Sequence, residues 1–211
     1  MTRILNGVLD GIRVLELGNQ ISAPFCSKLL ADYGADVIKV EPPDVGEETR
    51  RMGPFVGDDP HLDKSISFLY LNTNKKGVTL NFGTPTGMKV LTRLIVQADI
   101  LIQNFTPSAS ENLGLAFPLL NKLNPQLIVT SITPFGQTGP YRDLAATDIV
   151  TYALSGLMYH SGDSDREPLR NALNQSFYVA GVNGAVATTA ALFQRLATGT
   201  GQHVDVSTME C

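Results

Sequence analysis

The chain is poor in the residues that build metal centres and disulfide frameworks. Its 211 residues include no tryptophan, two cysteines and three histidines. Cys26 and Cys211 offer neither a disulfide framework nor a zinc-binding spacing, so we expect two free thiols. His61, His160 and His203 are far apart and form no HExxH pattern. The sequence therefore indicates no metal site.

A strong charge and long apolar runs are also missing. Sixteen Lys and Arg against 20 Asp and Glu give a formal net charge of −4, and the basic residues are scattered. Nucleic acid is therefore not an expected partner. No apolar run suggests a membrane span, and the N-terminus lacks the apolar core of a signal peptide, so we predict a cytoplasmic protein without membrane association.

What the chain does have is the composition of an ordered globular protein. Hydrophobic residues make up 43% of the chain and charged residues 17%, with no low-complexity segment. A length of 211 residues suffices for one substantial core. We therefore predict a single domain over residues 1–211.

Strand and helix patterns alternate along the chain. Strands are expected at 12–17, 36–40, 100–103, 127–132 and 203–207. Helices are expected at 23–33, from Thr84-Pro85 onward, after Asp148 and at 178–195. The first strand, helix and strand form a short βαβ unit with a right-handed crossover. We predict an α/β, Rossmann-like fold with an open parallel sheet and helices on both faces.

The helix expected at 178–195 has two faces of different character. Its bulky apolar residues predict the face that packs on the core; they are Val179, Val182, Val186, Ala190 and Phe193. Gly181, Gly184 and Ala185 leave little side chain on another face. Such a face permits the close approach of a second helix or of a ligand, and we favour the helix.

Asp148 stands where the Gly- and Pro-rich loop 134–140 becomes a helix. A carboxylate in a first helical turn meets unpaired amide groups and the positive end of the helix dipole, both of which favour an anion. Two interpretations are open at this point. Asp148 either caps the helix or is a carboxylate that performs chemistry.

The carboxyl ends of the expected strands bring four segments together. In open parallel sheets ligands bind at this edge, so residues 18–20, 41–43, 104–105 and 133–137 are expected to form a cleft. Glu41 ends the second strand where a dinucleotide enzyme carries its ribose-binding acid. The preceding loop, however, holds a single glycine, so a dinucleotide site is the weaker interpretation.

Two further features have an ordinary and a functional interpretation. Lys75 and Lys76 are typical of a solvated turn, but facing the cleft they would suit a phosphate-bearing cofactor, with Asn72 and Asn74 as hydrogen-bond donors. Phe105 is by default a core aromatic, but it could also stack on a purine base.

Seven blocks follow one another in a characteristic order. They are LADYGADVIKVEPP (30–43), NTNKKGVTLNF (72–82), ADILIQNFTP (98–107), LGL (113–115), SITPFGQTGPY (131–141), DIVTYALSGLM (148–158) and TGTGQHVDVS (198–207). In these blocks the chain resembles the family III CoA-transferases, the CaiB/BaiF type. That group includes formyl-CoA and carnitine CoA-transferases and the alpha-methylacyl-CoA racemases.

The resemblance implies transfer of coenzyme A from an acyl-CoA to a carboxylic acid, without a metal. Asp148 matches the family's nucleophile, which forms an aspartyl-CoA thioester, and Gln137 matches a polar position beside it. The positions that line the CoA channel in the family correspond here to Gln20, Asn74, Lys75, Asn104 and Phe105.

The chain departs from the family pattern at several points. Thr106-Pro107-Ser108 replaces the usual Arg-Pro-Gly, so one phosphate-binding cation is missing, and Arg50 is the candidate to compensate. Thr147 stands where the racemases have a histidine, which favours the transferase over racemase-type proton transfer.

Family members are also considerably longer, with a small second domain and interlocked dimers. We therefore expect the N-terminal part of the large domain, which would act in an interlocked homodimer or with a complementary chain. A non-catalytic half that binds CoA or a partner is the alternative.

Overall fold

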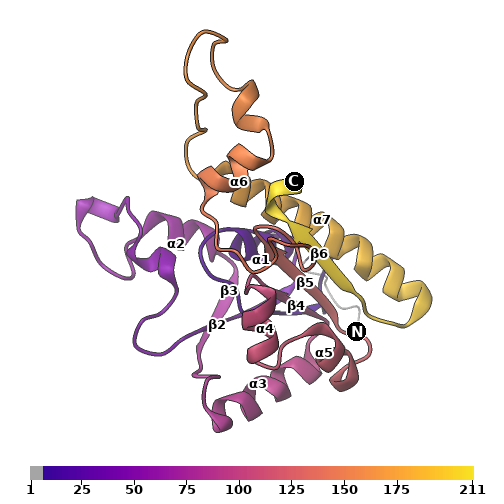
Figure 1. Ribbon diagram of the computed structural model, residues 1–211. Helices are drawn as coiled ribbons and strands as arrows, with labels where there is room; N and C mark the ends of the chain where they lie inside the picture. The colour runs from indigo at the N-terminus through magenta and orange to yellow at the C-terminus, as the bar shows by residue number, and fades with distance from the viewer. Residues whose placement is uncertain (1–6) are drawn as a thin grey trace.

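The computed structural model describes residues 7–211 and shows a central sheet of six parallel strands (Figure 1). The strands are β1 (Arg13–Glu16), β2 (Asp36–Glu41), β3 (Lys75–Thr79), β4 (Ile100–Gln103), β5 (Ile128–Thr133) and β6 (His203–Ser207). Their order in the sheet is β3-β2-β1-β4-β5-β6, and all neighbouring pairs are parallel. The strand order reverses between β1 and β4, and such a point is where open parallel sheets bind ligands.

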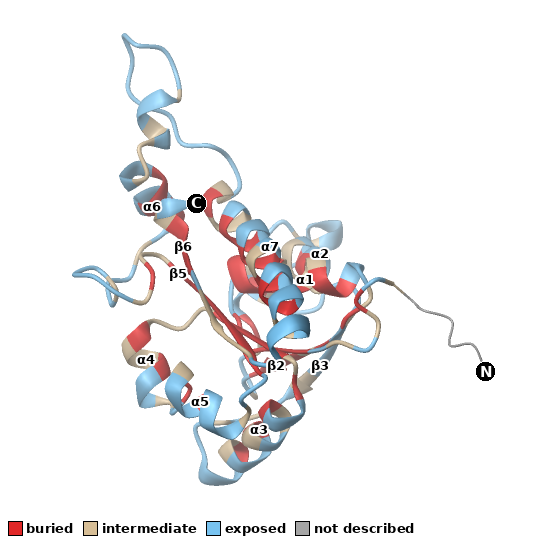
Figure 2. Cartoon of the chain, turned by 90° about the vertical axis from the view of Figure 1, so that its right-hand side faces the viewer, coloured by how far each residue is buried: buried red, intermediate tan, exposed pale blue. Residues whose placement is uncertain are grey.

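Helices cover both faces of the sheet, which confirms the predicted fold class (Figure 2). They are α1 (Ser22–Asp32), α2 (Ile66–Leu71), α3 (Pro85–Gln97), α4 (Pro107–Asn112), α5 (Phe117–Leu123), α6 (Asp148–Leu154) and α7 (Gln175–Thr198). Thr84 caps α3 by accepting a hydrogen bond from the Gly87 amide, as the Thr-Pro start predicts. The short helix α2 was not predicted, because six residues give too little periodicity.

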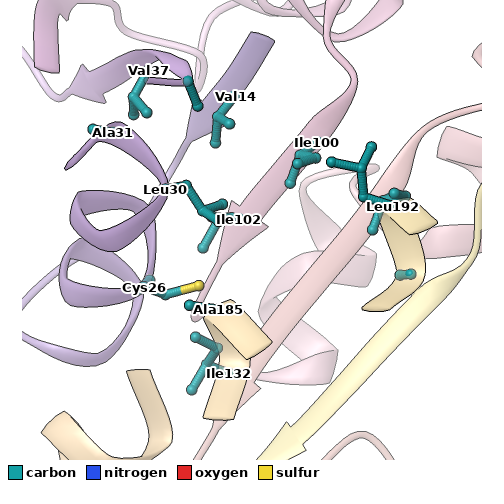
Figure 3. Packing of buried hydrophobic residues seen from close by; sticks show 14 of the residues in the cluster. Val14, Cys26, Leu30, Ala31, Val37, Ile100, Ile102, Ile132, Ala185 and Leu192 are labelled. Carbon is teal, nitrogen blue, oxygen red and sulfur yellow. The ribbon is translucent and has the colours of Figure 1, made fainter. Parts of the chain in front are cut away.

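The alternation of side chains along each strand divides the core in two. Ile100 and Ile102 point toward α1 and α7, whereas Leu101 between them points toward α3 and α5. In the first core, strand residues pack against Leu30 of α1 and Leu192 of α7 (Figure 3). The sheet is therefore buried on both faces, as parallel sheets require.

Helix α7 packs with the opposite face from the one its bulky residues predict. Val186 and Phe193 are 64% and 77% exposed, so the predicted core face is wrong. Apart from Leu192, the buried face consists instead of small residues, including Ala180, Gly181 and Gly184. A Cβ atom at Gly181 would lie 2.8 Å from the carbonyl oxygen of Ser22, so the small residues let α7 approach α1 closely. The predicted close approach of a second helix is confirmed.

Among residues 7–211, α7 is also the one helix long and apolar enough to cross a membrane by length and composition. The sequence analysis did not single out this run because threonine, asparagine and glycine interrupt it. Within the fold, 44% of its most apolar window is buried. Core helices pass the same test, and α7 packs as one.

The close contact between α7 and α1 can be tested with two glycine substitutions. In Gly181→Ala the new methyl group meets backbone, so we expect a loss of about 1–3 kcal/mol of stability. Gly184→Ala is the matched control, since its methyl group meets the movable end of the Ile132 side chain at 2.7 Å. We expect a much smaller effect there, because alanine also favours the helix. Urea denaturation measures both, and equal losses would contradict the proposed packing.

A buried ion cluster joins the first three strands. The Glu16 carboxylate is fully buried and lies 2.6 Å from Lys39 Nζ and 2.8 Å from Lys75 Nζ. Ser27 of α1 donates a further hydrogen bond of 2.6 Å. Burial by itself would raise the pKa of Glu16, but the two lysines outweigh it and lower the pKa to about 2. The carboxylate is therefore ionised inside the core.

We expect Glu16→Gln to lower stability at neutral pH by about 3 kcal/mol, because it leaves two buried lysines without a counter-charge. The folded pKa of Glu16, about 2, lies below the ordinary value of 4.5. Its ionisation therefore stabilises the fold above about pH 4.5, and this contribution is lost as the pH falls toward 2. Denaturation at pH 7 and pH 3 should show a smaller acid loss in Glu16→Gln than in the native protein.

The control is Glu111→Gln, which removes a half-exposed carboxylate paired with Arg142. It should change stability by less than about 0.5 kcal/mol. An acid profile of Glu16→Gln that parallels the native one would contradict the assignment.

Candidate active site

Asp148 is the first residue of α6 and only 4% exposed. Its Oδ1 accepts hydrogen bonds from the Ser176 amide at 3.0 Å and from the Ser176 hydroxyl at 2.5 Å. Its Oδ2 makes no hydrogen bond within residues 7–211. Of the two interpretations left open by the sequence, capping of its own helix is wrong, because Thr147 is the N-cap of α6 and the carboxylate binds the start of α7.

A cavity of about 360 Å³ lies at the carboxyl ends of the strands. It is lined by residues that include Gln20, Asn104, Phe105, Thr133, Ala146 and Phe177. Asp148 follows Ala146 by two positions, and its partner Ser176 directly precedes Phe177. Asp148 itself does not line the cavity, but residues close to it and to its partner in the chain do. Three of the four segments expected at this edge contribute to the cavity, whereas Glu41 and Pro42 line another one.

The loop after β1 is held in place by side chains from two other segments. Asn104 accepts a hydrogen bond from the Asn19 amide at 3.0 Å and donates one to the Asn19 carbonyl at 2.7 Å. The Gln20 amide donates to Glu47 at 2.7 Å, and the Gln20 side chain donates to Glu48 at 3.0 Å. These contacts hold Gln20 in a left-handed conformation with φ of 60°, so the loop is fixed rather than free.

Phe105 packs in the core and also lines the cavity. Its ring meets Phe82 at 6.3 Å between centroids, within the core formed around α3 and α5. It also lines the 360 Å³ cavity, as does Asn104. The side chain is therefore a core aromatic with one part facing the cavity, a position in which it can contact a ligand.

Arg50 and Glu41 neutralise each other. Two nitrogens of Arg50 lie 2.7 and 2.9 Å from the Glu41 oxygens, and a third lies 2.9 Å from Asp63. Burial opposes the ionisation of Glu41, but the hydrogen bonds from Arg50 and from the Glu47 amide outweigh it and lower the pKa of Glu41. Glu41 is thus not free to bind a ribose, and Arg50 faces a separate cavity of about 460 Å³.

Lys75 and Asn74 do not reach the cavity beside Asp148. The Lys75 ammonium is 2% exposed, and its three N–H groups go to Glu16, the Pro24 carbonyl and Asn72. Asn74 precedes β3 and donates to Asp32 at the end of α1, which places it at the amino edge of the sheet. Both residues therefore lie outside this cavity, and the hydrogen bonds of their side chains go to the core and to a helix end.

Gln137 lines a different cavity, of about 210 Å³, together with Ser131 and His203. Its backbone amide donates to Asp205 at 3.0 Å, and its Nε2 is buried without a partner in the described chain. Burial lowers the pKa of His203, whose ring meets the Ser131 hydroxyl at 2.9 Å. Gln137 is therefore close in sequence to the loop of the site, but no hydrogen bond joins it to Asp148.

Two residues of the site, Ser176 and Thr151, were not predicted from the sequence. Ser176 makes the contacts described above, and Thr151 lies 2.9 Å from the Ser176 hydroxyl. Ser176 lies 28 positions from Asp148, so no local spacing pairs them. A serine at a helix start was the available signal, but the predicted helix began three residues too late. No cluster of metal-binding side chains occurs within residues 7–211.

The doubly wound sheet with a cavity at the carboxyl ends of its strands is typical of α/β proteins that bind a ligand at this edge. Residues 9–211 match the family described as CoA-transferase family III, and the chain belongs to this family. The resemblance found in the sequence blocks is thereby confirmed.

Relatives and solved structures agree with this assignment. The chain is 38% identical to a succinate–glutarate CoA-transferase of Agrobacterium fabrum, over 96% of this chain and 51% of that protein. It is 38% identical to the beta subunit of a succinyl-CoA–L-malate CoA-transferase of Chloroflexus aurantiacus, over 96% and 49%. A CaiB/BaiF family protein from Brucella suis has a similar structure, with a TM-score of 0.90, 37% identity and coverage of 98% and 54%. The chain thus spans about half the length of the relatives it matches.

The clamp on the loop after β1 predicts the effect of Asn104→Ala. The substitution removes both hydrogen bonds to the Asn19 backbone, so we expect a loss of about 1 kcal/mol. In a protein of this size that loss lowers the melting temperature by about 2–4 °C. Calorimetry with Asn121→Ala, an exposed asparagine in α5, as the control tests this. An unchanged melting temperature in Asn104→Ala would show that the loop does not depend on the clamp.

Proposed function

We propose that the chain transfers coenzyme A between carboxylic acids, with Asp148 as the nucleophile. The observation that carries this proposal is the unequal use of the two carboxylate oxygens. Oδ1 is held by Ser176, while Oδ2 makes no hydrogen bond within residues 7–211. Ala146 and Phe177, close in the chain to Asp148 and Ser176, line the 360 Å³ cavity. A carboxylate acts as a nucleophile through an oxygen with free lone pairs, and Oδ2 is such an oxygen.

The reaction consists of two symmetric halves. Oδ2 attacks the thioester carbon of the acyl-CoA, the carbon–sulfur bond breaks, and CoA thiolate leaves behind a mixed anhydride on Asp148. The thiolate then attacks Cγ of Asp148 and releases the first acid, which carries Oδ2 away. A second carboxylate then attacks Cγ of the aspartyl-CoA thioester, which releases the thiolate and forms a second mixed anhydride. The thiolate attacks the acyl carbon of the second acid and forms the new acyl-CoA. Asp148 thereby regains a carboxylate whose new oxygen comes from the second acid.

In this proposal, the residues that line the cavity bind the acyl-CoA. Gln20 and Asn104 present amide groups to the acyl-CoA, and Phe105 offers an aromatic face. The acids remain to be identified; the two relatives named above act on succinate with glutarate and on succinyl-CoA with L-malate. We therefore propose small dicarboxylic acids as the first substrates to test.

Racemase-type proton transfer has no support in the structure. It needs an acid and a base on opposite sides of the reacting carbon. None of the three histidines contacts Asp148, since His203 binds Ser131, His61 binds the Asp63 amide, and His160 packs beside Tyr159. We therefore propose the transferase as the function to test first.

The assembly is part of the same proposal. One relative is named as a beta subunit, and this chain spans about half the length of its relatives. We propose that the active form is either an interlocked homodimer that includes the remaining part of the family architecture or a complex with a complementary chain. A half that binds CoA without forming an adduct is the rival to test.

Intact-protein mass spectrometry with succinyl-CoA and acetyl-CoA tests the nucleophile. We expect a mass increase of one CoA less one water, removed by hydroxylamine and absent in Asp148→Asn. Asp143→Asn is the matched control, because Asp143 lies five positions away with an exposed carboxylate. An adduct that survives in Asp148→Asn would contradict the proposal. CoA binding without an adduct would identify the non-catalytic half.

A labelled acceptor tests the route of the oxygen. With 18O in both carboxylate oxygens of the second acid, one turnover should leave a single 18O atom in the peptide that contains Asp148. Direct transfer that bypasses Asp148 would leave none.

A further inference from the structure

Ser176 contacts the oxygen of Asp148 that does not leave during the proposed reaction. Both its amide and its hydroxyl donate to Oδ1, at 3.0 and 2.5 Å. Oδ2 departs with the first acid, so Oδ1 becomes the carbonyl oxygen of the aspartyl-CoA thioester. The two hydrogen bonds of Ser176 thus lie on the oxygen of a carbonyl group whose carbon, Cγ, is attacked twice in each cycle.

Each attack at Cγ creates a tetrahedral carbon. The thiolate attacks Cγ of the anhydride, and later the second carboxylate attacks Cγ of the thioester. In both cases the electron pair of the carbonyl bond moves onto Oδ1, which becomes an oxyanion. Donors that are already aimed at such an oxygen stabilise the transition state without rearranging.

We propose that Ser176 is a catalytic residue that forms the oxyanion hole for the steps at Cγ of Asp148. This inference rests on the proposed function. It assigns to the start of α7 a chemical role that neither the sequence blocks nor the cavity lining indicated. The acyl carbon of the substrate is a different electrophile, and its oxyanion is outside the reach of this pair of donors while they bind Oδ1.

The surroundings of Ser176 keep both donors aimed at Oδ1. The Ser176 hydroxyl has one hydrogen, which goes to the carboxylate, and its oxygen lies 2.9 Å from the Thr151 hydroxyl. The Thr151 hydroxyl in turn lies 3.0 Å from the Asp148 carbonyl, so it ties Ser176 to the first turn of α6. Thr151 and Asp148 are nearly or fully buried, which strengthens such a chain of hydrogen bonds. Ser176 is the second residue of the 24-residue helix α7, so its amide has no acceptor within the helix.

A merely structural alternative exists and makes a different prediction. Asn174, the N-cap of α7, makes no side-chain cap, so Asp148 could serve only to cap this helix. Loss of a cap would lower stability and leave the chemistry at Cγ unchanged. The test must therefore measure a reaction step at Cγ by itself.

Hydroxylamine cleavage of the preformed aspartyl-CoA adduct is that step, because hydroxylamine attacks Cγ and the charge moves onto Oδ1. The adducts of the native chain, Ser176→Ala, Ser176→Thr and Ser155→Ala are isolated and their decay is followed by mass spectrometry. Removing one donor from an oxyanion hole slows a reaction by about 10²-fold, which is the loss we expect in Ser176→Ala. Ser176→Thr keeps a hydroxyl and should recover most of the rate.

Ser155→Ala is the matched control, since Ser155 follows α6 and binds the Tyr152 carbonyl away from Asp148. Its adduct should decay at the native rate. A native rate in Ser176→Ala would overturn the inference, and so would a faster decay, which a loosened site would produce. The dissociation constant for acyl-CoA should be unchanged in Ser176→Ala, because the hydroxyl acts on Asp148 and not on the bound ester.

Failure of the proposed function can be told apart from failure of this inference. If the native chain forms no adduct, the proposed function fails, and the inference falls with it. The hydrogen bond itself is tested separately by NMR, where the Ser176 amide proton should move upfield in Asp148→Asn. An adduct that forms on Asp148 but decays equally fast in Ser176→Ala overturns the oxyanion hole alone.

Discussion

The ion cluster around Glu16 is the constraint on which the rest of the structure depends. A carboxylate and two ammonium groups are stable in an apolar core only while they contact one another with their hydrogen bonds satisfied. Glu16 lies on β1, Lys39 on β2 and Lys75 on β3, so the register of three strands must bring them together. The same contacts hold the loop after β1, since Lys39 also donates to the Gly18 carbonyl at 3.2 Å.

The loops that follow the strands lie around one cavity at the carboxyl edge of the sheet. The loop after β1 is clamped by Asn104 and Glu47, and the segment after β5 leads through a glycine-rich turn into α6. On the other side, the small residues of α7 let that helix lie close against α1, which brings Ser176 to Asp148. The position of the carboxylate is thus set by helix packing as much as by its own loop.

Much of the fold was predictable because it depends on local patterns. Strands β4 and β6 and the start of α3 lie where alternation and a Thr-Pro cap place them. The packed face of α7 was not predictable from apolarity. Its glycines and alanines are buried because they let two helices approach closely, while its valines are left partly exposed. The burial of Lys75 was not predictable for a similar reason, because its counter-charge Glu16 lies 59 positions away.

The sequence by itself determined the α/β class, the family and the identity of the carboxylate at a loop-to-helix junction. These features follow from the order of residues, because hydrophobic periodicity and local capping hydrogen bonds fix where helices and strands form. Only the tertiary structure decided which charges are neutralised in the core, and which oxygen of Asp148 is held and which has free lone pairs. Such pairings join residues far apart in the chain, and their geometry exists only after the strands and helices have packed.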